Sequence, residues 1–257
     1  MYKQSLIKLA IIAFFALLLN PLIVFAAEEK PPELVNMWVM EVDSDNFEKF
    51  EKGFKEHIKD RVKAGDKFNW QVYTPHTGSN MNSYIIRACC FKWAEMDDYA
   101  KWANDSKIMD GWSKGPGQYV EKYHHQYSWI DMKNSHWKDG AKYKYVGVTK
   151  YYLKHDAKDV DKSVKEISDL AKDIKWDMSW SWESDVTGKG DTLYVAFGFE
   201  NFAAMDPSGP SFGELAEKHL GSKEKVDEIF DRFAEKYKGT HYEIYRHRPD
   251  LSMPSDK

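Results

Sequence analysis

The chain carries the same sequence pattern twice, and this duplication limits its possible folds more than any other feature. Trp93-Ala94-Glu95-Met96-Asp97 matches Phe202-Ala203-Ala204-Met205-Asp206, and the apolar segment before each also matches. Further matches follow in the same order: Thr77-Gly78 with Thr187-Gly188, Glu121-Lys122-Tyr123 with Glu235-Lys236-Tyr237, and His125 with His241. Because colinear matches indicate repeated structural units, we predict two similar units, over 27–133 and 142–249.

Each copy contains one order of predicted elements. An apolar strand comes first, and a helix follows whose apolar residues recur at helical spacing, as do Phe50, Phe54 and Ile58. Two strands, a second helical stretch and a last strand complete each copy. The predicted strands are 34–42, 68–74, 83–91 and 124–131 in the first copy, and 143–153, 176–183, 192–200 and 240–246 in the second. The order βαββαβ predicts an antiparallel sheet with helices on one face.

The second face of each predicted sheet must also be covered, and the other sheet can cover it. This arrangement resembles the dimeric α+β barrel superfamily in its single-chain tandem form. The resemblance rests on element order, duplication and unit length. It implies an α+β fold in which two tandem ferredoxin-like βαββαβ units pack sheet to sheet. Members include cofactor-free monooxygenases, haem enzymes similar to chlorite dismutase and small isomerases, so the resemblance implies no single function.

The ends of the chain and the joint between the copies have distinct patterns. Residues 1–26 read as a secretory signal peptide, with Lys3 and Lys8 before an apolar run and small residues at the expected cleavage point. An uncleaved membrane anchor is the alternative, although Asn20-Pro21 interrupts the run. We expect an exported protein, periplasmic or secreted, with no membrane contact after cleavage. Polar residues 134–141 serve as a linker, and 250–257 as a tail.

Composition excludes several function classes. The net charge is −4, with 37 basic and 41 acidic residues, so we expect no nucleic-acid partner. The sequence contains no nucleophile elbow, phosphate-binding loop or dinucleotide fingerprint. It also lacks the HExxH and CxxC spacings of metal sites, so we predict no metal. A haem stays open, because a single axial histidine leaves no sequence signature, and His219 or His241 would be the residue to test.

Cys89 and Cys90 are adjacent in an apolar segment. Neighbouring side chains on a strand point to opposite faces. The spacing also differs from that of redox CxxC pairs. We therefore expect two buried thiols, with a redox pair as the alternative.

Alternating tryptophans mark one strand of the second copy. Trp180 and Trp182 alternate with polar residues, and Trp70 is the match of Trp180 in the first copy. Such a stripe is typical of a core face, but it is also compatible with an aromatic wall of a ligand pocket. We predict Trp70, Trp180 and Trp182 as ligand-binding residues, together with Tyr73 and His125.

The candidate catalytic residues lie on the later strands of each copy. His241 shares a strand face with Glu243, which is a minimal general-base pair and also a common surface arrangement. Arg87 interrupts an apolar strand, where it either pairs across the two sheets or faces a bound anion. Its match in the second copy is Ala196, so the charge is present once. We predict His241, Glu243 and Arg87 as the catalytic residues.

These residues lead to one main functional hypothesis and two alternatives. The first is an exported small-molecule-binding protein with an aromatic-lined pocket for an apolar or aromatic ligand, monooxygenase-like by resemblance. The second is a haem-dependent enzyme of the same superfamily. The third is a non-catalytic module that binds glycans through exposed Trp102, Trp112 and Trp137. We expect a monomer or a small homo-oligomer.

Overall fold

The computed structural model describes residues 33–138, 140–188 and 190–254. The predicted signal peptide lies outside them. The first repeat contains β1 (Glu33–Val42), η1 (Ser44–Asn46), α2 (Phe47–Lys63), β2 (Trp70–Pro75), β3 (Ser83–Phe91), α3 (Trp93–Ser106), α4 (Ile108–Lys114), η2 (Pro116–Tyr119) and β4 (Val120–Ile130). The second contains β5 (Tyr145–Leu153), α5 (Val160–Asp173), β6 (Trp180–Asp185), β7 (Thr192–Phe199), η3 (Ala203–Met205), α6 (Phe212–Leu220), α7 (Lys223–Ala234) and β8 (Tyr237–His247). The predicted order βαββαβ is present twice.

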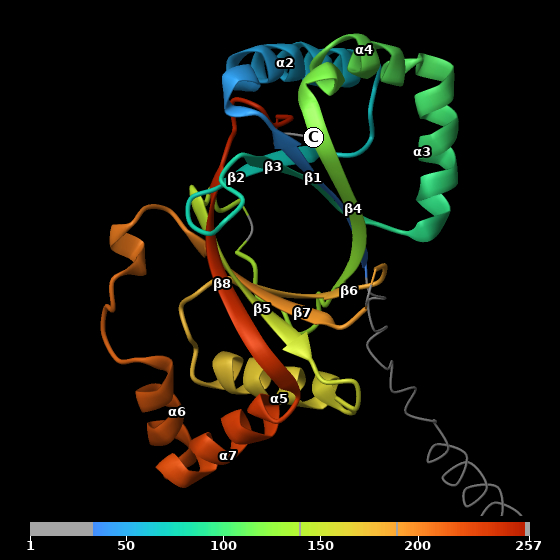
Figure 1. The fold of residues 1–257 in the computed structure, drawn as a ribbon. Helices are drawn as coiled ribbons and strands as arrows, with labels where there is room; N and C mark the ends of the chain where they lie inside the picture. Colours follow the sequence, from blue (N-terminus) through green and yellow to red (C-terminus); the bar gives the residue numbers. More distant parts are fainter. Residues whose placement is uncertain (1–32, 139, 189, 255–257) are drawn as a thin grey trace, which may run out of the picture. The chain divides into compact units, whose positions relative to one another are not determined.

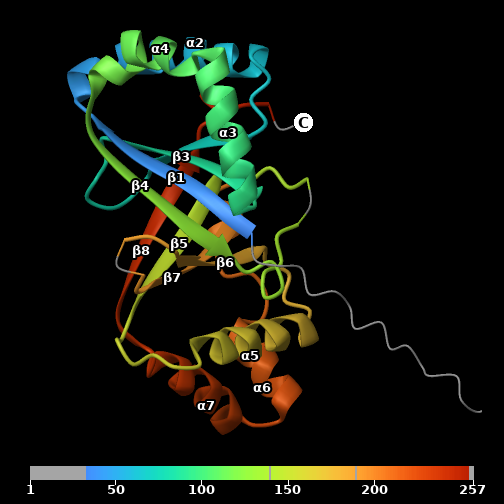
Figure 2. The ribbon, with the colours of Figure 1, turned by 90° about the vertical axis from the view of Figure 1, so that its right-hand side faces the viewer.

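The strands form one closed antiparallel barrel in the order β1-β3-β2-β8-β5-β7-β6-β4. Each repeat contributes four adjacent strands, and the two sheets join edge to edge through β2–β8 and β4–β6. Helices α2, α3 and α4 lie outside the first sheet, and α5, α6 and α7 lie outside the second (Figures 1 and 2). This confirms the α+β fold of two ferredoxin-like units that face each other through their sheets.

Side chains alternate along each strand between a helix-covered face and the barrel interior. The helix-covered faces are apolar and form separate cores, one around Phe50 and Phe54 of α2 and another around Trp182 and Phe233. No helix in the described part of the chain is long and apolar enough to cross a membrane. Burial of the apolar faces between each sheet and its own helices stabilises each repeat.

The barrel interior, in contrast, contains paired polar groups. Arg87 forms an ion pair with Glu183 of the opposite repeat, and Ser128 Oγ donates a hydrogen bond of 3.2 Å to the same carboxylate. Tyr194 donates to Asp185 at 3.0 Å. Arg87 thus pairs across the two sheets, which is one of the two arrangements that the sequence allows.

The segment expected to be a linker is fixed to the second sheet. His136 and Trp180 exchange backbone hydrogen bonds, and Trp180 Nε1 donates to the carbonyl of Asn134 at 2.8 Å. These contacts hold residues 134–136 beside β6. The first residues of the connection between the repeats, 134–136, are therefore packed on the second sheet.

The expected tail is also part of the folded core. Leu251 and Met253 are 1% and 5% exposed, and both belong to the apolar core of the first repeat. The backbone N–H of Met253 donates to the carbonyl of Trp70 at 2.9 Å. Within the segment expected as a tail, Leu251 and Met253 are therefore packed against the first repeat.

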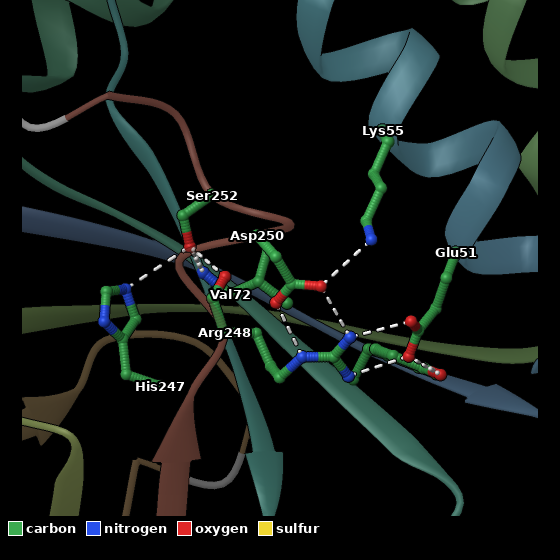
Figure 3. Close-up of polar contacts among 8 residues, drawn as sticks. Glu51, Lys55, Val72, His247, Arg248, Asp250 and Ser252 are labelled. Carbon is green, nitrogen blue, oxygen red and sulfur yellow. Dashed lines mark hydrogen bonds and ion pairs between the residues drawn. The ribbon is translucent and has the colours of Figure 1, made fainter.

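An ionic cluster holds this C-terminal segment on α2 (Figure 3). Arg248 makes a bidentate contact with Glu51, at 2.7 Å to each carboxylate oxygen, and its Nε lies 2.8 Å from Asp250. Lys55 reaches Asp250 at 3.1 Å. Hydrogen bonds from Arg248 hold the pKa of Glu51 and that of Asp250 below their ordinary values. The second repeat thereby fastens the end of the chain to the first.

The two cysteines correct another expectation. Cys89 and Cys90 form a disulfide with each other, and Cys90 is exposed. The register of β1 against β3 shifts between Leu34 and Val35, so that Cys90 has no partner in the ladder. At such a bulge, adjacent side chains need not diverge to opposite faces. The prediction of two buried thiols is therefore wrong.

Candidate functional site

A cavity of about 560 Å³ lies between the first sheet and helices α2, α3 and α4. Strands β1, β2, β3 and β4 form its floor. Its lining is Asn36, Trp38, Met40, Phe54, His57, Ile58, Arg61, Trp70, Ile86, Met96, Tyr99, Met109, Trp112, Tyr123, His125 and Tyr127. Aromatic and aliphatic side chains dominate this lining and a few polar groups interrupt it, which is the usual character of a small-molecule site.

One wall of the cavity is a stacked pair of rings from β1 and β4. Trp38 and His125 are opposite each other in the strand pairing, and their rings stack at 3.9 Å with an angle of 8°. His125 Nε2 lies 2.9 Å from Asn36 Oδ1. Burial lowers the pKa of His125. The imidazole is thus held neutral and in a fixed orientation at neutral pH.

A buried polar network lies on another wall of the cavity. Arg61 of α2 is paired with Asp66 at 2.8 Å, with side chains 9% and 0% exposed. Asp66 also accepts a hydrogen bond of 3.1 Å from Trp70 Nε1, and Arg61 donates to the hydroxyl of Tyr99. The guanidinium carbon lies 5.4 Å from the centre of the Trp70 ring, within cation–π range.

His57 completes this network. Its Nε2 lies 3.2 Å from Arg61 Nη1, and its Nδ1 is buried with no hydrogen-bond partner among the described residues. Burial, followed by the charge of Arg61, lowers the pKa of His57 to about 4. The imidazole is therefore neutral, and because Nε2 accepts from Arg61, the hydrogen resides on Nδ1. A side chain at Gly111 of α4 would contact this atom.

The second repeat carries apolar residues at the positions of this network. Ala64 and Ile174 are the C-cap residues of α2 and α5, and each bonds through its N–H to the carbonyl four residues earlier. Counting back from these caps aligns His57 with Ile167 and Arg61 with Ala171. The N–H groups of Asp66 and Trp176 bond to the carbonyls of Arg61 and Ala171, so these two positions also match. An apolar cluster that includes Trp176, Trp180 and Trp182 packs there.

Comparisons with solved structures identify this architecture. The fold is similar to that of a "putative monooxygenase" from Lactobacillus acidophilus NCFM, with a TM-score of 0.55 and 10% identity over 86% of this chain and 96% of that one. A "putative monooxygenase" from Fusobacterium nucleatum gives 0.54 and 10%, over 84% and 92%. A mutant chlorite dismutase from Candidatus Nitrospira defluvii gives 0.54 and 8%, over 86% and 94%.

This chain has the fold of a single-chain dimeric α+β barrel. The sequence matches no protein-family model and no curated protein. At these identities the similarity establishes the fold, so any function must come from the residues of this barrel's own site.

Two of the five predicted ligand-binding residues, Trp70 and His125, line the cavity between the first sheet and its helices. Trp180 and Trp182 lie in the core of the second repeat, where Trp182 Nε1 donates to Ser168 Oγ at 3.0 Å. They are packed as core residues, which is the other arrangement that the stripe allows. Tyr73 lies in the barrel interior, where burial raises its pKa and Arg87 is a charged neighbour.

Two of the three predicted catalytic residues, His241 and Glu243, are paired on β8, and Arg87 pairs elsewhere with Glu183. His241 Nε2 is 3.2 Å from Glu243 Oε1, and Lys150 Nζ is 2.9 Å from Glu243 Oε2. Tyr245 also donates to Glu243. None of them belongs to the lining of the first-repeat cavity, and neither does Arg87. Their catalytic role remains an untested prediction.

The proposed match between His125 and His241 is wrong. Trp38 of β1 pairs with Ile86 on one side and with His125 on the other. Thr149 of β5 pairs with Val195, the match of Ile86, and on its other side with Tyr242. His125 therefore corresponds to Tyr242. Because neighbours on a strand face opposite ways, the shift by one residue places His241 in the barrel interior and His125 on the helix-covered face.

Two tryptophans expected as exposed glycan platforms are instead half-buried. Trp112 lines the cavity and donates to the Tyr123 hydroxyl at 3.2 Å, and Trp102 Nε1 donates to the carbonyl of Ala64 at 2.8 Å. Trp137 is 40% exposed. Of the three tryptophans expected to form an exposed glycan-binding surface, only Trp137 is exposed.

The polar network was absent from the sequence-based predictions. A signal for it exists, because His57 and Arg61 are one helical turn apart and adjoin the apolar stripe of α2. Asp66 and Tyr99 have no such signal. They come from a loop and from α3, and only the folded chain brings them to Arg61.

A haem would require a histidine nitrogen directed into a cavity. His57 uses Nε2 toward Arg61 and has Nδ1 against α4. His219 is exposed near Asp173, and His241 pairs with Glu243. These three side chains do not fit a haem. The His125 ring is stacked on Trp38 and has Nε2 at Asn36, which leaves Nδ1 for a ligand. We assign no step to a haem. In the described ranges, no three His, Cys, Asp or Glu side chains gather to hold a metal ion.

Proposed function

We propose that the chain is an exported protein that binds a planar apolar or aromatic molecule in the first-repeat cavity and oxidises it without a cofactor. The observation that carries the proposal is the difference between the repeats. The cavity and the buried network of His57, Arg61 and Asp66 occur in the first repeat, whereas the second has apolar residues at the network positions. A fold that packs well without these polar groups retains them for a ligand.

The chemistry follows from His125. Its Nε2 is engaged with Asn36, and the neutral ring then offers the lone pair of Nδ1 to a ligand hydroxyl. Removal of the phenolic proton makes the ring electron-rich enough to react with O₂. One oxygen atom becomes a quinone carbonyl, and the second leaves as water with the phenolic and ring hydrogens. The names of the two monooxygenase neighbours support this reaction class.

The test compares two histidines in one protein. The chain is expressed with residues 1–26. If it is exported and cleaved, the mass of the mature protein is expected to equal that of a chain starting at Ala27. Binding of 1-naphthol is followed by tryptophan fluorescence, and O₂ uptake by an electrode. His125→Gln is expected to lower turnover at least about 100-fold, since a general base contributes 10²–10⁴-fold. His241→Gln tests the competing catalytic residue predicted from the sequence, and a site in the first-repeat cavity predicts wild-type turnover for it.

The opposite ranking of the two variants would move the site into the barrel interior, where His241 and Glu243 lie. Binding without O₂ uptake, unchanged in His125→Gln, would leave a binding protein and contradict the oxidation step. Absence of binding by 1-naphthol and by larger fused-ring phenols would contradict the proposed ligand class. A chain that keeps residues 1–26 in a membrane fraction would contradict export.

A further inference from the structure

The buried Arg61–Asp66 pair is costly for the fold. Removing two charges from water is unfavourable, and a buried pair rarely stabilises a protein more than well-packed apolar residues do. Ala171 and Trp176 are such apolar residues at the matched positions of the second repeat. The pair therefore needs an explanation other than stability.

The pair reaches the cavity through Tyr99. Arg61 donates a hydrogen bond to the Tyr99 oxygen, so the hydroxyl hydrogen of Tyr99 is left for another acceptor. The described residues provide no acceptor for it, and Tyr99 lines the cavity. Burial raises the pKa of Tyr99 to about 12, and the hydroxyl keeps its proton at neutral pH.

The Tyr99 ring is held in one orientation. It stacks on Phe68 at 4.4 Å with an angle of 8°, and Trp102 lies 5.4 Å away. Phe68 is itself fixed, since its N–H donates to Asp66 at 2.9 Å. A donor that is already in place needs no reorganisation when charge develops nearby, and this gives such donors their effect in enzymes.

We propose that Tyr99, supported by the guanidinium of Arg61, donates a hydrogen bond to a ligand oxygen and favours the state in which that oxygen is negatively charged. This rests on the proposed function, and it narrows the ligand to a phenol or an enol. Asp66 balances the charge of Arg61, so the site does not simply attract anions. Because the Arg61 contact withdraws electrons from the Tyr99 oxygen, the donor is strongest toward a developing phenolate.

The test measures the ionisation of a bound phenol rather than turnover. The probe is 4-nitro-1-naphthol, whose phenolate absorbs visible light, and it is titrated with pH at saturating protein. Tyr99→Phe is expected to lower the phenolate-to-phenol ratio of the bound probe about tenfold at a fixed pH, which is one pKa unit. The matched control is Tyr151→Phe, a half-buried tyrosine of the second repeat, for which we expect the wild-type ratio.

The outcomes separate this inference from the proposed function. Probe bound by Tyr99→Phe with an unchanged phenolate ratio would overturn the role of Tyr99, while binding itself stands. No binding by the wild type would overturn both. If Tyr99→Phe does not fold, Arg61→Lys provides the second measurement. A lysine keeps the charge beside Asp66 but cannot contact Asp66, His57 and Tyr99 together, so the ratio is expected to fall here as well.

Discussion

The two repeats share one order of elements and differ in what lies between sheet and helices. In the first, the helices and the sheet leave a cavity with a buried charged network. In the second, Trp182 and Phe233 pack in the corresponding layer, with ring centres 5.9 Å apart. Val72 and Trp182 occupy matched positions on β2 and β6. A small residue in the first repeat therefore corresponds to a large one in the second.

The difference separates what the fold needs from what the site needs. Both repeats have the apolar faces, the helix ends and the strand pairings that set the barrel. The His57–Arg61–Asp66 network is added to this frame in one repeat. A duplicated fold therefore contains its own reference, because each polar residue of the first repeat can be compared with its partner in the second.

The largest expected effect on stability comes from creating a cavity in the core of the second repeat. Trp182 is 4% exposed, and Trp182→Val gives that position the residue found in the first repeat. We expect a loss of about 3–5 kcal/mol in the free energy of unfolding, because a large buried ring leaves a cavity and an unpaired Ser168 hydroxyl. Urea denaturation measures this loss. Trp137→Val, at a 40% exposed position, is the control and should cost less than about 1 kcal/mol.

A loss below about 1 kcal/mol in Trp182→Val would mean that the second repeat does not depend on tight packing at this position. The contrast with the first repeat would then be one of chemistry alone. Binding of 1-naphthol is expected to be unchanged in this variant, since Trp182 does not line the cavity.

Much of the barrel can be predicted from the sequence. The repeat, the order of elements along the chain and the helix stripes follow from self-similarity and periodicity. The pairing of Arg87 with Glu183 fits one of the two expected arrangements for a charge between two sheets. These features are local or follow from patterns that the chain repeats.

The errors arise where one residue of register or a distant segment decides the outcome. The His125–His241 match fails because a shift of one residue reverses a strand face. The cavity could not be located because α3 and α4 set its size, and broken helical patterns do not fix where a helix packs. Leu251 and Met253 reach the first repeat across the whole sequence, so no local pattern marks them as core residues.

The second prediction tests whether the buried ion pair serves the fold. Asp66→Ala removes hydrogen bonds from Arg61, Trp70 and Phe68 and leaves a buried guanidinium unpaired. We expect a loss of about 3 kcal/mol in the free energy of unfolding. The double variant Arg61→Met/Asp66→Ala resembles the second repeat, and we expect it to recover at least half of that loss. A double variant no more stable than Asp66→Ala would show that the pair itself stabilises the first repeat.

The smallest effect is a pH dependence that distinguishes His57 from Ile167. The pKa of His57 falls from 6.5 to about 4 on folding, so the unfolded chain takes up the proton first as the pH decreases. The wild type should lose more stability through this window than His57→Ile does, because the buried His125 and His247 contribute a loss in both proteins. Between pH 7.5 and pH 5, the difference in unfolding free energy should move in favour of the variant by roughly 1–2 kcal/mol.

The matched control for this prediction is Ile167→Val in the second repeat. It exchanges no titratable group, so its stability difference from the wild type should be the same at both pH values. Parallel pH profiles for His57→Ile and the wild type would indicate that His57 is already protonated, or solvated, in the folded state. In that case its Nδ1 would not be the unpaired buried donor that the first repeat shows beneath α4.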